Sequence, residues 1–227
     1  MLLAPLIPIL LLWVLQSLAR DKRGVALEPA IARHDVARIG ALVGAGINAN
    51  VVLPRNRNLL MVAVTHDDYP TIKLLRGAGA NPDPSTELFL ATIEGDETRV
   101  AAALDKGANV NSEDYDGGTA LFFAVARKRV AIVRFLLQRG ARVNHQNQAG
   151  WTALMYALNY LDPECTALLL ARGANPYLQN KNHRNAWQER FDGDLFPYQA
   201  ANTQKIRALL RRYRRNERRN ERHSEAR

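Results

Sequence analysis

The chain carries GGTALFFAVARKRVAIVRFLLQRG at residues 117–140, and this stretch aligns without a gap with GWTALMYALNYLDPECTALLLARG at residues 150–173. In both, apolar residues recur at helical spacing in two short segments separated by a polar turn. Thr119 and Thr152 stand where a hydroxyl can accept a hydrogen bond from a free amide at a helix start. Each stretch therefore predicts two antiparallel helices, the first of which begins just after the threonine.

Glycines that end the second apolar segment recur along the chain at intervals of 33, 28, 33 and 33 residues. They are Gly46, Gly79, Gly107, Gly140 and Gly173. A glycine at this point can adopt the left-handed backbone conformation that closes a helix C-terminus. Self-similarity at such a period is typical of a repeat protein, in which each unit buries its apolar face against the next. The sequence thus predicts a stack of about five to six helix pairs.

This unit resembles the ankyrin repeat, whose pattern is roughly G-x-T-P-L-H-x-A, a turn, V-x-x-L-L-x-x-G-A and a loop. The resemblance is strongest over residues 117–173, weaker but in register over 28–107, and degenerate after residue 180. It implies an all-α solenoid of stacked helix-turn-helix repeats that binds other proteins. Phe122 and Met155 stand where the family usually has histidine, so the stabilising hydrogen bond of that histidine is not expected.

Two further departures from the family pattern concern the earlier repeats. Asn58 replaces the capping threonine, and asparagine caps a helix well, so the helix start should survive. The loop between Gly79 and Thr86 is shorter than in the other repeats and carries Pro82 and Pro84. A projecting hairpin is therefore not expected there.

The last repeat is predicted to close the stack. Asn185 occupies a helix-cap position, and Ile206, Leu209 and Leu210 reproduce the apolar spacing of a second helix. Residues 192–203 between them are an insertion relative to the family. Because the exposed end of a stack must be made soluble, we interpret this segment as a terminal repeat. We expect the repeat domain to span 27–212 and a basic tail to follow at 213–227.

The N-terminal residues 1–19, MLLAPLIPILLLWVLQSLA, carry no charge, and the first basic residues follow in a linker at 20–26. The apolar run is at the short end of what crosses a membrane as a helix. We interpret it as an N-terminal hydrophobic helix, a single-pass membrane anchor, and the basic linker then favours a cytoplasmic repeat domain. An export signal cleaved after Ala19, with an exported or periplasmic repeat domain, and a soluble amphiphilic arm remain alternatives.

The net charge of +9 is concentrated at the C-terminus. Residues 205–227 contain ten Lys or Arg and three Glu, a net charge of +7, which leaves about +2 for the rest of the chain. A solvated helix is the ordinary interpretation of such a segment. The alternatives are contact with acidic lipid headgroups, or with the backbone of a nucleic acid.

The resemblance implies that loop tips and the exposed face of the first helices hold an unknown protein partner. Carried over residue by residue, it gives the partner-binding candidates Tyr115, Asp116, Arg127, Gln148, Trp151, Tyr156, Asn159 and Tyr160. Tryptophan, tyrosine and arginine contribute most of the binding energy in many interfaces, so Trp151 is the first candidate. The alternative for Trp151 is packing against the adjacent loop.

The sequence offers no catalytic arrangement. The five histidines are scattered without metal-ligand spacing, and no glycine-rich loop of the phosphate-binding kind is present. The single cysteine, Cys165, cannot form an intramolecular disulfide and lies in an apolar helical segment, which favours a buried structural thiol. We therefore expect a binding protein that is not an enzyme and that needs no metal or cofactor.

Overall fold

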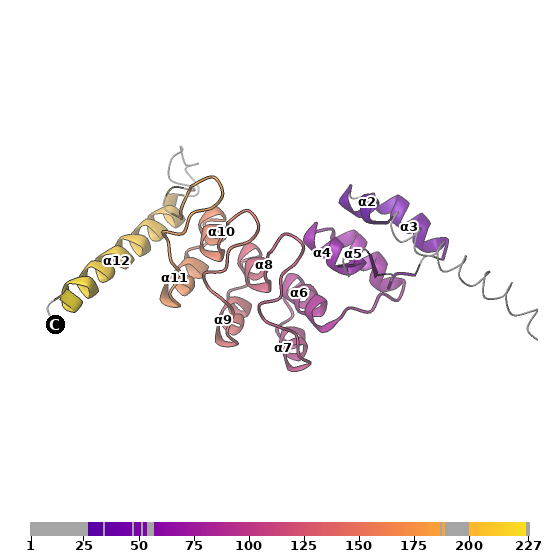
Figure 1. The fold of residues 1–227 in the computed structure, drawn as a ribbon, viewed down its shortest axis with the longest axis horizontal. Helices are drawn as coiled ribbons and strands as arrows, with labels where there is room; N and C mark the ends of the chain where they lie inside the picture. The colour runs from indigo at the N-terminus through magenta and orange to yellow at the C-terminus, as the bar shows by residue number, and fades with distance from the viewer. Residues whose placement is uncertain are drawn as a thin grey trace, which may run out of the picture. The chain divides into compact units, whose positions relative to one another are not determined.

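The computed structural model describes residues 27–33, 35–46, 48–50, 52–53, 57–186, 188 and 200–225. The chain forms two compact units, residues 1–86 and 87–227. In the described residues, the helices are joined by loops and turns, and the strands among the named elements are two of two residues each (Figure 1). The hydrophobic helix predicted at 1–19 and the linker at 20–26 lie outside the described residues. Within the described ranges, no helix is long and apolar enough to span a membrane.

The first unit contains two helix pairs joined through a short hairpin. The first pair comprises α2 (Leu27–Ala32) and α3 (Val36–Gly44), and the second comprises α4 (Leu59–Thr65) and α5 (Tyr69–Gly77). Between them, β1 (Val52–Leu53) pairs antiparallel with β2 (Arg57–Asn58). The Oδ1 atom of Asn58 accepts a hydrogen bond from the Met61 amide at 2.6 Å, which confirms Asn58 as the cap of α4.

The second unit begins within α6 (Pro84–Glu94) and continues as a stack of helix pairs. The further helices are α7 (Glu97–Asp105), α8 (Ala120–Ala126), α9 (Val130–Gln138), α10 (Ala153–Asn159) and α11 (Pro163–Ala171). α8 packs on α10, whereas α9 packs on both α7 and α11, so first and second helices form separate layers (Figure 1). Leucine, valine, isoleucine and alanine side chains fill the space between the layers. No hairpin precedes α6, as predicted from the two prolines.

The helix boundaries follow the predicted signals, with one exception. The five closing glycines have φ angles between +84° and +95°, which confirms the left-handed helix ends. Thr152 caps α10, because its hydroxyl accepts a hydrogen bond from the Met155 amide at 3.3 Å. The same prediction for Thr119 is wrong, since its side chain makes no cap hydrogen bond. The Phe122 amide bonds instead to the backbone carbonyl of Thr119 at 2.9 Å.

An asparagine four residues after a closing glycine joins one repeat to the next. The Nδ2 atom of Asn144 donates to the Gly173 carbonyl at 3.1 Å, and its Oδ1 atom accepts from the Asn175 amide at 2.7 Å. Asn111 makes the equivalent pair of bonds one repeat earlier, and Asn50 does so in the first unit. These side chains tie successive loops together by polar contacts outside the apolar core.

Asn144→Ala should destabilise the protein by about 1–2 kcal/mol, because it removes two hydrogen bonds between repeats. The measurement is the free energy of unfolding from urea denaturation, compared with Gln138→Ala. Gln138 is an exposed residue near the end of α9, and its replacement should change stability by less than about 0.5 kcal/mol. Equal effects of the two substitutions would contradict a bridging role for Asn144.

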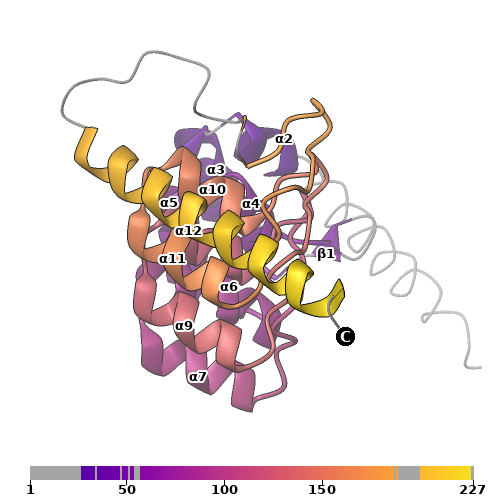
Figure 2. The same cartoon turned by 90° about the vertical axis from the view of Figure 1, so that its left-hand side faces the viewer.

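The C-terminal end of the stack is covered by α12 (Ala200–Glu225). Thr203, Ile206 and Leu210 of α12 are buried, and the helix packs on α11 (Figure 2). Asn185 and Gln188 cap each other, each side-chain oxygen accepting the other residue's amide, at 3.2 Å and 3.1 Å. No described helix begins at Asn185, so its role as a helix cap stays a prediction.

One predicted boundary near the C-terminus differs from the structure. The insertion predicted at 192–203 overlaps the helix, because α12 already begins at Ala200, before its first buried residue. The helix continues past residue 212 to Glu225, as expected for a solvated helical tail, and the domain boundary at 212 stays a prediction. Apolar spacing locates only the packed turns of a helix, so it misses turns that precede or follow them.

Candidate functional site

The loops of the second unit share a turn that recurs every 33 residues. Its central residues are Asp114, Asn147 and Asn180. In each, one side-chain oxygen accepts hydrogen bonds from the amides two and four residues later, at distances between 2.7 and 3.1 Å. These three residues are not among the predicted site residues, although their regular spacing is a signal that could have found them.

Successive loop tips are hydrogen-bonded to one another. The Gln148 amide donates to the Asp116 carbonyl at 2.9 Å, and the Gln148 side chain donates to the Tyr115 carbonyl at 2.8 Å. The Lys181 amide continues the pattern by donating to the Ala149 carbonyl at 3.0 Å. The structure therefore brings together three predicted candidates, of which Asp116 and Gln148 are exposed and Tyr115 is half-buried.

Three other predicted candidates form an aromatic cluster, which we define as Trp151, Tyr156 and Tyr160. The rings of Trp151 and Tyr156 have centroids 5.2 Å apart, and those of Tyr156 and Tyr160 are stacked with centroids 6.4 Å apart. Trp151 and Tyr156 are half-buried, whereas Tyr160 is 42% exposed. Trp151 thus packs inside its own repeat, against Tyr156, and forms one end of a continuous aromatic row.

The aromatic cluster rests on side chains from the preceding repeat. The buried Phe122 ring meets Tyr156 edge-on at 5.4 Å and His145 edge-on at 5.9 Å. The Nε2 atom of His145 lies 2.9 Å from the Gly117 carbonyl, so this nitrogen carries the hydrogen and donates it. His145 therefore donates a hydrogen bond to the loop, although positions 122 and 155, where the family usually has histidine, carry Phe and Met.

The hydroxyl of Tyr156 is held by a loop residue. The Nδ2 atom of Asn147 donates to the Tyr156 hydroxyl at 3.4 Å, and the Asn147 Oδ1 atom holds the Trp151 amide. Burial, and then the neighbouring Tyr160, raise the pKa of the Tyr156 phenol, so it stays protonated at neutral pH. The row is consequently a neutral aromatic surface whose positions are fixed by the loop.

Arg127 and Asn159, the two remaining candidates, lie at helix ends. Arg127 follows the last residue of α8, and Asn159 is the last residue of α10. Both are half-buried, and neither takes part in the ring contacts of the aromatic cluster. Their assignment to a binding surface therefore stays a prediction.

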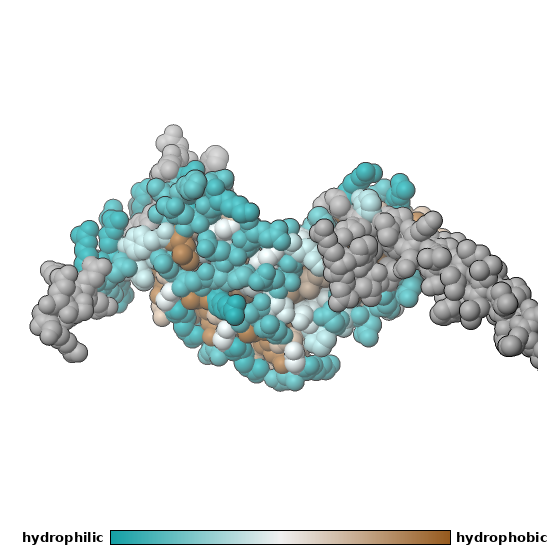
Figure 3. Space-filling view, viewed as in Figure 1, coloured by the Kyte–Doolittle hydropathy of each residue, from teal (hydrophilic) through white to brown (hydrophobic). Residues whose placement is uncertain are grey.

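Large hydrophobic side chains are rarely exposed in the described part of the chain. The face drawn in Figure 3 is largely hydrophilic, with hydrophobic side chains showing in small areas. The large hydrophobic residues that are exposed among the described residues are Tyr69, Tyr160 and Tyr177. Tyr160 is the one that belongs to the aromatic cluster, which makes this cluster the most promising contact surface.

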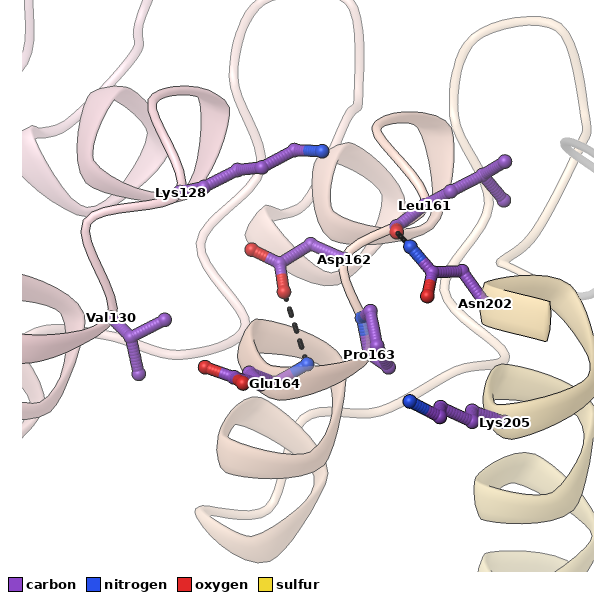
Figure 4. A pocket seen from close by; sticks show the side chains of 8 residues that line it. All are labelled: Lys128, Val130, Leu161, Asp162, Pro163, Glu164, Asn202 and Lys205. Atoms are coloured by element: carbon purple, nitrogen blue, oxygen red, sulfur yellow. Dashed lines mark hydrogen bonds between the residues drawn. The ribbon is translucent and has the colours of Figure 1, made fainter. Parts of the chain in front are cut away.

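A pocket of about 300 Å³ lies where α12 meets the turn between α10 and α11 (Figure 4). Asp162 caps α11 there, because its Oδ1 atom accepts from the amides of Glu164 and Cys165. Asn202 of α12 donates to the Leu161 carbonyl at 3.1 Å. The lining contains two lysines, Lys128 and Lys205, and two acidic residues, Asp162 and Glu164. The pocket therefore lies at the contact by which α12 attaches to the repeats.

The residues considered for catalysis have structural positions. Cys165 is buried, and burial followed by the neighbouring Asp162 raises the pKa of its thiol, so the thiolate is disfavoured. Within the described residues, no group of three or more His, Cys, Asp or Glu side chains could hold a metal ion. Cys165 therefore belongs to the apolar core, as its sequence position predicts.

The comparison with protein families agrees with this geometry. A family model described as "Ankyrin repeats (3 copies)" matches residues 60–147 and 88–180, which together cover more than half of the 227 residues. The chain belongs to the ankyrin-repeat family. The matched residues lie inside the predicted domain at 27–212, whose outer limits stay a prediction. No curated protein matches the chain.

Proposed function

We propose that the repeats bind a protein partner through the aromatic cluster and the adjoining loop tips. Ankyrin repeats generally mediate protein–protein interaction and are generally not enzymes, which is the general function that family membership supports. The observation that carries the specific proposal is the stacked Tyr156–Tyr160 pair, with Tyr160 42% exposed. Aromatic side chains bring large contact area with a polar end, and are therefore common at the centres of interfaces.

The rigidity of this surface supports the proposal. Tyr156 is fixed by Asn147 and Phe122, and the loop tips are fixed by the bonds through Gln148. A surface whose side chains are already ordered loses little conformational entropy when a partner binds. We therefore expect the partner to bind without a large change in the backbone. The expected partner is a protein that the repeats bind without catalysing a reaction on it.

Tyr160→Ala should weaken partner binding at least tenfold, because it removes the exposed ring of the aromatic cluster. The partner is captured from a cell extract with the full chain, identified, and titrated against each variant. Tyr69→Ala, which removes an exposed tyrosine of the first unit, is the matched control and should bind like the unsubstituted protein. Equal binding by all three proteins would refute the proposed surface, provided that their thermal transitions agree.

We also propose that residues 1–19 anchor the chain in a membrane, with the repeats on the cytoplasmic side. The support is the uncharged apolar run and the basic residues that follow it. An exported repeat domain with a cleaved signal is the competing proposal.

A C-terminal reporter on the full chain, together with N-terminal sequencing of the mature protein, separates the two proposals for the N-terminus. The anchor predicts a membrane-bound chain that retains Met1 or Leu2, with a reporter that external protease does not reach in intact cells. A chain that begins near Arg20, or a reporter open to protease, would instead establish export.

A further inference from the structure

α12 carries a dense basic face that the aromatic cluster does not use. Between residues 201 and 219, eight side chains are basic and one is acidic, a net charge of +7. All eight basic side chains are exposed, and they are Lys205, Arg207, Arg211, Arg212, Arg214, Arg215, Arg218 and Arg219. The charge is therefore presented to solvent along the helix, and we call these eight residues the basic ridge.

The basic ridge faces away from the packed side of α12, except at its edge, where Arg214 also hydrogen-bonds to the Tyr177 hydroxyl of the repeats. At about 100° per residue, the eight side chains fall within an arc of about 180°. The complementary arc holds the residues that attach the helix, namely Thr203, Ile206, Leu210, Tyr213 and Glu217, all buried or half-buried. The Tyr177 hydroxyl donates to the Glu217 carboxylate at 2.8 Å, so the acidic residue faces the repeats and leaves the ridge purely basic.

The length of the basic ridge matches a row of several nucleic-acid phosphates. From Lys205 to Arg219 the helix rises about 21 Å, at 1.5 Å per residue. One strand of a duplex presents a phosphate about every 3.4 Å, so the ridge spans about six phosphates. Seven of the eight residues are arginines, whose planar guanidinium groups can bind phosphate through two hydrogen bonds.

A membrane surface fits the ridge less well than a nucleic acid does. Helices that lie in a membrane interface bury an apolar face opposite their basic face. In α12 the apolar face is already occupied, because Ile206 and Leu210 are buried against the repeats. Between residues 201 and 219, the apolar side chains within the arc of the ridge are Ala201 and Ala208. Lipid contact would therefore rest on charge alone.

We propose that the basic ridge of α12 binds the phosphodiester backbone of a nucleic acid, without sequence preference. The repeats hold the helix by one face and present the other, so the ridge is ordered before binding. This activity is independent of the aromatic cluster. It uses a different helix and a different chemistry.

The test is fluorescence anisotropy of the full chain, in a neutral detergent, with labelled single-stranded RNA and duplex DNA over a range of salt concentrations. The variant Arg211→Gln, Arg215→Gln, Arg219→Gln removes three exposed charges of the ridge. Its control, Lys73→Gln, Lys106→Gln, Arg134→Gln, removes three exposed charges elsewhere. Glutamine has a helix propensity close to that of arginine, so α12 should remain folded, and circular dichroism checks this.

The proposal predicts that affinity falls steeply with salt for the unsubstituted chain. The ridge variant should bind at least tenfold more weakly, and for duplex DNA its slope of log affinity against log salt should be shallower by about two to three, because each lost phosphate contact contributes about 0.9. The control should keep the original slope. Three outcomes would overturn the proposal: no binding at low salt, an equal loss in the control, or, in a parallel titration with phosphatidylserine vesicles, a ridge variant that loses binding to the vesicles but not to the nucleic acids.

Discussion

Gly150→Ala should lower the free energy of unfolding by about 2–4 kcal/mol, whereas Gly173→Ala should lower it by about 1 kcal/mol. Both glycines have a positive φ, +78° and +84°, and both substitutions carry the cost of a left-handed conformation. Only at Gly150 would the added Cβ atom also lie too close to a neighbouring loop. A Cβ atom there would lie 2.8 Å from the Asn180 Cα atom and 2.9 Å from the Lys181 amide nitrogen.

The contact at Gly150 is costly because it involves backbone atoms that no side-chain rotation can move aside. Residue 173, by contrast, has nothing within 4 Å of the added carbon. The corresponding residue of the next loop is His183, which adopts a φ of +58° with its side chain. The turn conformation alone is therefore tolerated, and the close approach of the following loop is what requires glycine at 150.

Urea denaturation of the two glycine variants measures the difference directly. A larger loss for Gly150→Ala would support loops stacked through their backbones. If the two variants lost the same free energy, the stacking of loop 147–151 on loop 180–184 would be contradicted. The comparison also bears on function, because the same loop positions Trp151 through Asn147.

Asp114→Asn should raise the free energy of unfolding above that of the unsubstituted protein. This gain should be up to about 3 kcal/mol larger at pH 7 than at pH 4. Burial raises the pKa of the Asp114 carboxyl to about 6, although the amides of Gly118 and Asp116 partly offset this by donating hydrogen bonds to it. Because the pKa is raised in the folded state, the acid form stabilises the fold. That contribution is fully present below about pH 4 and is lost as the pH rises through 6.

Asparagine is a suitable replacement because the protein uses it at the two equivalent positions. With a neutral side chain, Asn147 and Asn180 each accept hydrogen bonds from the equivalent backbone amides, two and four residues later. The substitution should therefore keep the turn and remove only the cost of burying a charge. Unfolding free energies of both proteins between pH 4 and pH 8 provide the measurement. A difference that stays constant with pH, or narrows as the pH rises, would contradict the assignment.

Helix pairs and their ends could be predicted from the sequence because they depend on local signals. Apolar spacing gave the two helices of each repeat, and the recurring glycines gave their ends, which the φ angles confirm. The Thr119 cap was predicted wrongly, since a hydroxyl competes there with a backbone carbonyl for the same amide. The acceptor that the amide uses depends on the backbone conformation where the chain enters α8, and residue type does not reveal that conformation.

The candidate surface could be predicted only as separate residues. Trp151, Tyr156 and Tyr160 were each selected by resemblance, but their stacking depends on the path of the chain around the end of α10. Contacts between residues 33 positions apart, such as Gln148 with Tyr115, depend on how one repeat is placed on the next. The separation of basic and packed faces on α12 likewise requires knowing which side of the helix the repeats cover.

The most direct test of the central claim, that the aromatic cluster binds a protein, is site-specific photo-crosslinking in cells. A photoreactive phenylalanine analogue replaces Tyr160 in the full chain, and a second protein carries it at Tyr69, which is 52% exposed in the first unit. We expect a discrete cross-linked product from position 160, identified by mass spectrometry, that position 69 does not give. A cross-linked product from position 69 alone, or no product from either position, would contradict the claim that the aromatic cluster binds a protein.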